Sequence, residues 1–265
     1  MIRRVMALAE YFGRSLLFSL AGLLYILFAL VCWWVLFDPQ QTTPHVDYYI
    51  LVNGVLGVTF AFLVTLTIAA HANRAVHYPW LARLPSRTEY LAAALISGFV
   101  CATALQILVA LLATFHGPAF TLGRALQLPM VWLPINLLGV LMALHTSDLV
   151  SNGWSRVCLY GGLLIFYLGQ RVNETTTAGL AARLDGLGNA FNLLSRWIAS
   201  AEASSIAQIF GIPFWPFGAL TNAVRADTFQ PSLILAPMVL VLYGVILWRL
   251  AAKLFVGKDL QLTEQ

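Results

Sequence analysis

Few side chains in this sequence have a type and spacing that could do chemistry, and most of them gather in one short stretch. Residues 72–89, ANRAVHYPWLARLPSRTE, place three arginines, two prolines and a glutamate between long apolar runs. The histidines that flank or enter this stretch, His71 and His77, lack the spacing and carboxylate neighbours of a metal site. The stretch instead combines apolar and cationic side chains, a combination that suits the docking of a protein partner. The candidate docking residues are Pro79, Trp80, Leu81, Arg83, Leu84, Arg87 and Glu89.

Two prolines divide this stretch into a short helix and a turn. Pro79 suits the first turn of a helix, where its missing N–H is not needed, and Pro85 disfavours helical geometry in the residue before it. The sequence therefore predicts a helix over 79–84. The letters SRTE then predict a capping box, in which Ser86 caps the next helix and Glu89 bonds back. The alternative to this rigid elbow is an ordinary loop whose arginines only signal topology.

A second polar pair, His145 and Asp148, lies at the end of an apolar run. Their separation of three predicts a shared helix face, and polar pairs at membrane depth are functional candidates. A hydrated helix end is the alternative. Deeper polar residues either bond across helices or line a path: Asn53, Thr59, Thr65, Thr67, Gln106 and Asn136. No catalytic, cofactor-binding or metal-ligating residue is predicted.

Membrane-spanning helices must position these residues. The chain of 265 residues is 60% hydrophobic and only 10% charged, whereas a soluble domain carries about 25% charged residues. Five apolar runs are long enough to cross about 30 Å of hydrocarbon. These runs are 15–37, 49–70, 90–115, 128–146 and 233–250. We therefore expect an all-α, polytopic membrane protein with a single transmembrane domain over 1–265.

A weaker apolar run, 157–170, is interpreted as a sixth span, with a re-entrant segment as the alternative. Six spans place both termini on the same side of the membrane. That side then holds ten of the fifteen Lys and Arg residues, so the positive-inside rule predicts that it is cytoplasmic. The ten are Arg3, Arg4, Arg14, Arg74, Arg83, Arg87, Arg156, Arg249, Lys253 and Lys258.

Two further segments lie outside the predicted spans. Apolar residues recur at helical spacing within 1–13, which predicts an amphipathic helix along the cytoplasmic membrane surface. They are Ile2, Val5, Met6, Ala9 and Phe12. The segment 171–231 contains a predicted amphipathic helix and the aromatic stretch IFGIPFWPFGAL, which two prolines break and which suits the bilayer interface or a re-entrant hairpin. Phe214, Trp215 and Phe217 form a candidate outer gate, with a packing cap as the alternative.

The passage LARLPSRTEYLAA, residues 81–93, resembles the region after the second span of ABC-2 type permeases, the membrane subunits of many ABC exporters. Other features resemble the organisation of this family as well. They are the amphipathic N-terminal helix, the six predicted spans, the long outer segment before the last span, and the ending VLYGVILWRLAAKLFVGKDL over 241–260.

The resemblance implies a transport mechanism. Residues 72–89 would form a cytoplasmic coupling elbow that rests on a separate ABC ATPase, which binds ATP and Mg²⁺. The chain has no G-x-x-x-x-G-K-[ST] phosphate loop, so we expect no enzymatic activity from it alone. It would pair with a second copy or a related permease in the bacterial cytoplasmic (inner) membrane, and it would export a hydrophobic, lipid-like or peptide substrate. Accessory subunits are further candidate partners, and nucleic acid is not expected to bind.

Two other classes are alternatives to a permease. An integral membrane enzyme would need a buried constellation of acids, histidines or a nucleophile, but the five histidines form no H-E-x-x-H motif and no G-x-S-x-G is present. Another ATPase-coupled scaffold, such as the energy-coupling membrane subunit of vitamin importers, is similar in size. Its paired Ala-Arg-Gly signatures are missing here.

Overall fold

The structure is a computed structural model that describes residues 2–37, 45–74, 77, 83–115, 117–118, 121–151, 215–226 and 230–257. Over these ranges the chain forms seven α-helices and no strand, which confirms the all-helical class for the described part. The helices are α1 (Ile2–Leu17), α2 (Leu20–Phe37), α3 (Val46–Ala72), α5 (Arg87–Thr114), α6 (Leu122–Thr146), α11 (Trp215–Arg225) and α12 (Ser232–Val256).

Five of these helices are long and apolar enough to cross a membrane, namely α2, α3, α5, α6 and α12. Each overlaps one of the five strong apolar runs of the sequence. Apolar side chains cover much of their outward surface, and only 17% of the apolar window of α2 is buried inside the bundle. The sixth predicted span, 157–170, lies outside the described residues.

The chain turns sharply between α1 and α2, where the sequence pattern predicted one continuous run. α1 continues to Leu17, and the first span begins at Leu20 instead of Ser15. The hydroxyl of Ser19 donates to the carbonyl of Leu16 at 2.6 Å and accepts from the N–H of Gly22 at 3.2 Å. A Cβ atom on Gly22 would clash with the Leu16 carbonyl. Both helices are apolar at the turn, so hydropathy alone did not reveal the break.

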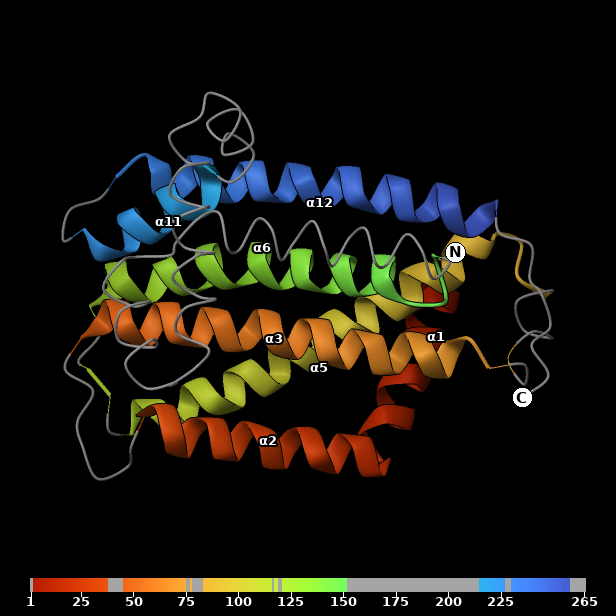
Figure 1. The fold of residues 1–265 in the computed structure, drawn as a ribbon, viewed down its shortest axis with the longest axis horizontal. Helices are drawn as coiled ribbons and strands as arrows, with labels where there is room; N and C mark the ends of the chain where they lie inside the picture. The colour runs from red at the N-terminus through yellow and green to blue at the C-terminus, as the bar shows by residue number, and fades with distance from the viewer. Residues whose placement is uncertain are drawn as a thin grey trace, which may run out of the picture.

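α3 is the central helix of the bundle, and it packs against α5 and α6 (Figure 1). The amide Nε2 of Gln106 donates to the carbonyl of Asn53 at 2.8 Å, and Nδ2 of Asn136 donates to Oε1 of Gln106 at 2.6 Å. Gly57 makes room for these bonds, since a Cβ there would clash with the Gln106 amide. The side chains of Gln106 and Asn136 therefore bond across helices, as polar groups inside membrane bundles commonly do, whereas Nδ2 of Asn53 donates to the carbonyl of Tyr49 within α3.

The two ends of the bundle differ in charge. α1, the end of α3, the start of α5 and the ends of α6 and α12 meet at one end, on the right in Figure 1, and α11 lies at the other. We name these the basic end and the α11 end. Eight of the ten described Lys and Arg residues belong to the basic end: Arg3, Arg4, Arg14, Arg74, Arg83, Arg87, Arg249 and Lys253. Arg124 and Arg225 belong to the α11 end.

Candidate functional site

The predicted elbow joins α3 to α5 at the basic end (Figure 1). Three of its candidate docking residues lie outside the described residues: Pro79, Trp80 and Leu81. Arg83 and Arg87 are exposed, whereas Leu84 is half-buried and packs on the hydrophobic core. The described part of the elbow therefore turns its leucine inward and carries its arginines on the surface.

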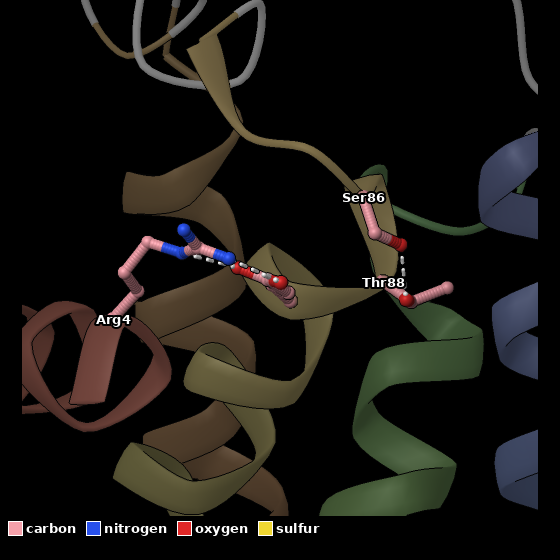
Figure 2. A network of polar contacts seen from close by, with 4 residues as sticks. Arg4, Ser86 and Thr88 are labelled. Carbon is pink, nitrogen blue, oxygen red and sulfur yellow. Dashed lines mark hydrogen bonds and ion pairs between the residues drawn. The ribbon is translucent and has the colours of Figure 1, made fainter. Parts of the chain in front are cut away.

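α5 begins where the sequence predicted, directly after Ser86, but the predicted capping box is wrong. The Ser86 side chain makes no capping hydrogen bond, and its hydroxyl lies 2.6 Å from that of Thr88 (Figure 2). The N–H of Glu89 is satisfied by the backbone carbonyl of Ser86 at 3.1 Å. The Glu89 carboxylate does not accept a hydrogen bond from the N–H of Ser86, because it binds Arg4 of α1 instead.

That carboxylate joins the start of α5 to the N-terminal helix. Nε and Nη2 of Arg4 donate to the two oxygens of Glu89, each at 3.2 Å (Figure 2). The Arg4 side chain is 52% exposed and the Glu89 side chain only 4%. A buried carboxylate needs a cationic partner, and two-point contact fixes the orientation of both groups. The pair therefore fastens α1 to α5 immediately after the elbow.

Aromatic rings pack α1 against the loop and the neighbouring helices. His77 packs edge-on against Tyr11 and Phe12, with ring centroids 5.9 and 6.3 Å apart, and Phe12 packs edge-on against Tyr90 at 5.3 Å. Phe12, His77 and Tyr90 are buried, and the Tyr90 hydroxyl donates to the carbonyl of Ala72 at 2.7 Å. Edge-to-face aromatic pairs contribute about 0.5–1.5 kcal/mol each. α1, the end of α3, His77 and the start of α5 thus form one packed unit.

The two histidines of this unit lie side by side, with ring centroids 4.9 Å apart. Burial lowers the pKa of His77 below its usual 6.5, and the nearby His71 and Arg74 lower that pKa further. His77 is therefore neutral at pH 7. The hydroxyl of Ser15 lies 3.1 Å from Nε2 of His71. Within the described ranges no three His, Cys, Asp or Glu side chains come together in a metal-binding group.

A second arginine holds a short helix at the α11 end. Arg124, in the first turn of α6, donates through Nη1 to the carbonyl of Val224 at 2.7 Å and through Nη2 to the carbonyl of Ala226 at 3.2 Å. The same Nη1 donates to Oε1 of Gln127 at 3.1 Å. Carbonyls at a helix C-terminus lack partners within the helix and carry partial negative charge, which favours a cation there. Arg124 therefore caps α11, which also packs against α12.

The candidate outer gate is only partly described. Phe214 lies outside the described residues, whereas Trp215 is 48% exposed and Phe217 is half-buried against the core. α11 begins at Trp215, so Pro216 sits in its first turn, where proline is tolerated, and does not break the helix as the sequence pattern predicted. A gating role for these aromatic residues stays a prediction.

His145 and Asp148 do not share a helix face, so that prediction is wrong. α6 ends at Thr146, and Ser147 has an extended backbone with φ −80° and ψ 153°. His145 is buried, and its Nε2 lies 3.0 Å from the carbonyl of Leu247 on α12. Asp148 lies beyond the end of the helix and is exposed. The buried imidazole therefore contacts α12, whereas Asp148 is exposed.

Sequence reasoning did not identify Arg4 and Arg124 as site residues. A signal for Arg4 existed, because Glu89 begins an apolar span and a carboxylate at that depth requires a cation. The two residues are 85 positions apart, so spacing could not select the arginine. No comparable signal existed for Arg124, because its partners at α11 are backbone carbonyls, which every residue has.

Comparisons with protein-family models, with curated proteins and with solved structures found no match to this chain. The class of protein is therefore defined by the helices themselves. With five described helices able to span a bilayer, the chain is a multi-pass membrane protein. Its function has to be inferred from the geometry of the basic end.

Proposed function

We propose that this protein is the transmembrane permease subunit of an ABC exporter. It moves a hydrophobic, lipid-like or peptide substrate with energy from ATP, which a separate ATPase subunit hydrolyses with Mg²⁺. In this proposal the chain has six spans and lies in the bacterial cytoplasmic (inner) membrane with both termini in the cytoplasm. It pairs with a second copy or a related permease.

The fastening of the elbow to α1 is the observation that carries the proposal. A membrane subunit driven by a soluble ATPase must convert force on one loop into movement of its spans, so the joints beside that loop must be stiff. The ion pair between Arg4 and Glu89 and the aromatic packing around Phe12 supply such joints on the α1 and α5 sides. A loop that only signals topology would need neither.

The charge distribution supports the same orientation. Eight described cationic residues at the basic end against two at the α11 end favour a cytoplasmic basic end under the positive-inside rule. In this orientation the elbow faces the compartment that contains ATP. Arg83 and Arg87 are exposed on the same side, where they suit contact with a soluble partner.

The proposal is tested by purifying the tagged full-length chain from native membranes and measuring ATPase activity in what co-purifies. The disruptive variant changes Trp80 and Leu81 to aspartate and the exposed Arg83 to serine, and the control is Arg3→Ser, which alters an exposed residue of α1. We expect an ABC ATPase with the wild type and the control but not with the triple variant. Gel-filtration elution checks that each variant is folded. Retention of the ATPase by the triple variant, or its absence from every sample, contradicts the proposal.

A further inference from the structure

The basic end contains a cavity that the proposed function does not use. It lies between α1, α2 and α3 and has a volume of about 320 Å³. Apolar side chains from all three helices line part of it, including Leu16, Ala21 and Ile68. It adjoins the sharp turn between α1 and α2, which prevents these two helices from forming one continuous rod.

The polar part of the cavity carries positive charge, and the described residues supply no counter-charge to it. Arg74 lines it and is exposed, and its guanidinium makes no hydrogen bond or ion pair with any residue in the described ranges. No Asp or Glu lines the cavity. Ser15 and His71 line it as well, and their side chains are 3.1 Å apart. When Nε2 of His71 carries the proton and donates it to Ser15, the hydroxyl hydrogen of Ser15 remains available to an anion.

A neighbouring hollow, which shares Ser15 with this cavity, lacks this property. It has a volume of about 540 Å³ and is lined by both Glu10 and Arg14. These two side chains form an ion pair at 2.7 Å, so the arginine is already neutralised. Of these two hollows, only the cavity beside Arg74 combines an apolar wall with a cation that has no hydrogen-bond or ion-pair partner among the described residues.

The cavity lies where the apolar run 49–70 ends, since His71 and Arg74, which follow this run, line it. α3 has 27 residues and is therefore about 40 Å long, whereas the hydrocarbon core is about 30 Å thick. Because the apolar run ends at Ala70, we assign the excess length to this end, with the last turn and the following Arg74 beyond the hydrocarbon. The first turns of α2, whose Ala21 lines the cavity, expose a row of leucines along which an acyl chain can pack. They are Leu20, Leu23, Leu24 and Leu27.

We propose that this cavity binds the headgroup of an anionic phospholipid, with its phosphate at Arg74 and Ser15 and its acyl chains along α2. The absence of a lining carboxylate favours an anionic headgroup over one that carries a choline cation. The bound lipid would fill the space at the turn between α1 and α2. This inference does not depend on an ATPase partner and goes beyond the proposed function.

The test measures binding of a fluorescent phosphatidylglycerol to the full-length protein in a neutral detergent. Arg74→Gln removes the cation, and Ala21→Leu fills the apolar wall without changing charge. Arg3→Gln is the control, because Arg3 is an exposed arginine of the same end that does not line the cavity. We expect about fivefold weaker binding for Arg74→Gln, a clear loss for Ala21→Leu and no change for the control.

Competition identifies the source of the phosphate. Phosphatidylcholine and millimolar inorganic phosphate should displace the fluorescent lipid poorly, and unlabelled phosphatidylglycerol should displace it fully. If millimolar inorganic phosphate displaces the fluorescent lipid, the lipid assignment is overturned and the site binds a soluble phosphate. If Arg74→Gln and Arg3→Gln weaken lipid binding equally and Ala21→Leu binds fully, the lipid is attracted by the basic surface in general. That result would overturn the proposed site. Thermal melting of each variant confirms that the fold is retained.

Discussion

Each end of the bundle uses one arginine to hold a short helix, but the two arginines bind different partners. At the basic end, Arg4 on the short helix reaches a buried carboxylate, Glu89, on a span. At the α11 end, Arg124 on a span reaches the backbone carbonyls that end the short helix α11. The first contact depends on a particular acidic side chain, and the second depends only on where a helix ends.

This difference determines what happens when each arginine is lost. Glu89 is buried, so the loss of Arg4 leaves a charge in a low-dielectric site without its cation. The carbonyls of Val224 and Ala226 are neutral, so the loss of Arg124 leaves groups that water or a neighbouring N–H can satisfy. We therefore expect the basic end to be the more sensitive of the two.

The largest effect is expected for Arg4→Met. The change keeps the aliphatic part of the side chain but removes the partner of the buried Glu89 carboxylate. Because Arg4 itself is half exposed, the loss should be about 2 kcal/mol, below that of a fully buried pair. Denaturant titration in mixed micelles measures this free energy, and hydrogen exchange of residues 2–17 should rise.

Arg14→Met is the matched control for this change, since the pair of Arg14 with Glu10 is exposed at both side chains. Removal of such an i,i+4 pair should lower stability by about 0.3–0.5 kcal/mol. Equal effects of Arg4→Met and Arg14→Met would mean that the contact with Glu89 contributes no more than a surface ion pair.

A smaller effect, about 1 kcal/mol, is expected for Arg124→Met, which removes two hydrogen bonds to the C-terminus of α11. Hydrogen exchange should rise in 215–225 and stay unchanged in α1. Arg225→Met is the control, because Arg225 lies in the last turn of the same helix and is exposed. If hydrogen exchange in α11 rises as much for Arg225→Met as for Arg124→Met, the stabilisation comes from positive charge near the helix end and not from the hydrogen bonds of Arg124.

Acidification should weaken the basic end and spare the α11 end. The pKa of His77 is lowered by burial, by His71 and by Arg74, so the detached state binds a proton more readily than the packed one. The stability of the packed unit is then complete above about pH 6.5 and is lost as the pH falls through the lowered pKa. Hydrogen exchange of α1 at pH 7.5 and 5.5, corrected for the intrinsic rate, should report this loss.

His77→Phe keeps an aromatic ring and removes the titration, so the extra acid exchange of α1 should shrink in this variant. The contacts of Arg124 involve an amide and two carbonyls, none of which titrates in this range, so α11 provides the internal control. An unchanged acid response in His77→Phe would assign the effect to another group.

The smallest effect is expected for Ser86→Ala. A capping serine contributes about 0.5–2 kcal/mol, but the Ser86 hydroxyl contacts only the Thr88 hydroxyl among the described residues. Stability should therefore change by no more than about 0.3 kcal/mol. A loss of stability above about 1 kcal/mol would mean that Ser86 does cap α5. Glu89 would then be shared between the N-terminus of its own helix and Arg4.

Much of the fold could be predicted because a bilayer imposes a simple rule on composition. Backbone groups in hydrocarbon must bond internally, so long apolar runs such as 49–70 and 90–115 become helices such as α3 and α5. The start of α5 after Ser86 was also predictable, because Pro85 disfavours helical geometry in the residue before it. The break at Ser19 was not, since it depends on a local hydroxyl and the close approach at Gly22.

The sequence by itself determined that this chain is a multi-pass helical membrane protein, where its strong spans lie, and which stretch carries the charges. Each of these follows from local composition and from the cost of burying polar groups in hydrocarbon. Only the tertiary structure decided that Glu89 binds Arg4 rather than its own helix start, and that Arg124 caps α11. A side chain with several competent partners is assigned to one of them by packing, which brings together residues that are far apart along the chain.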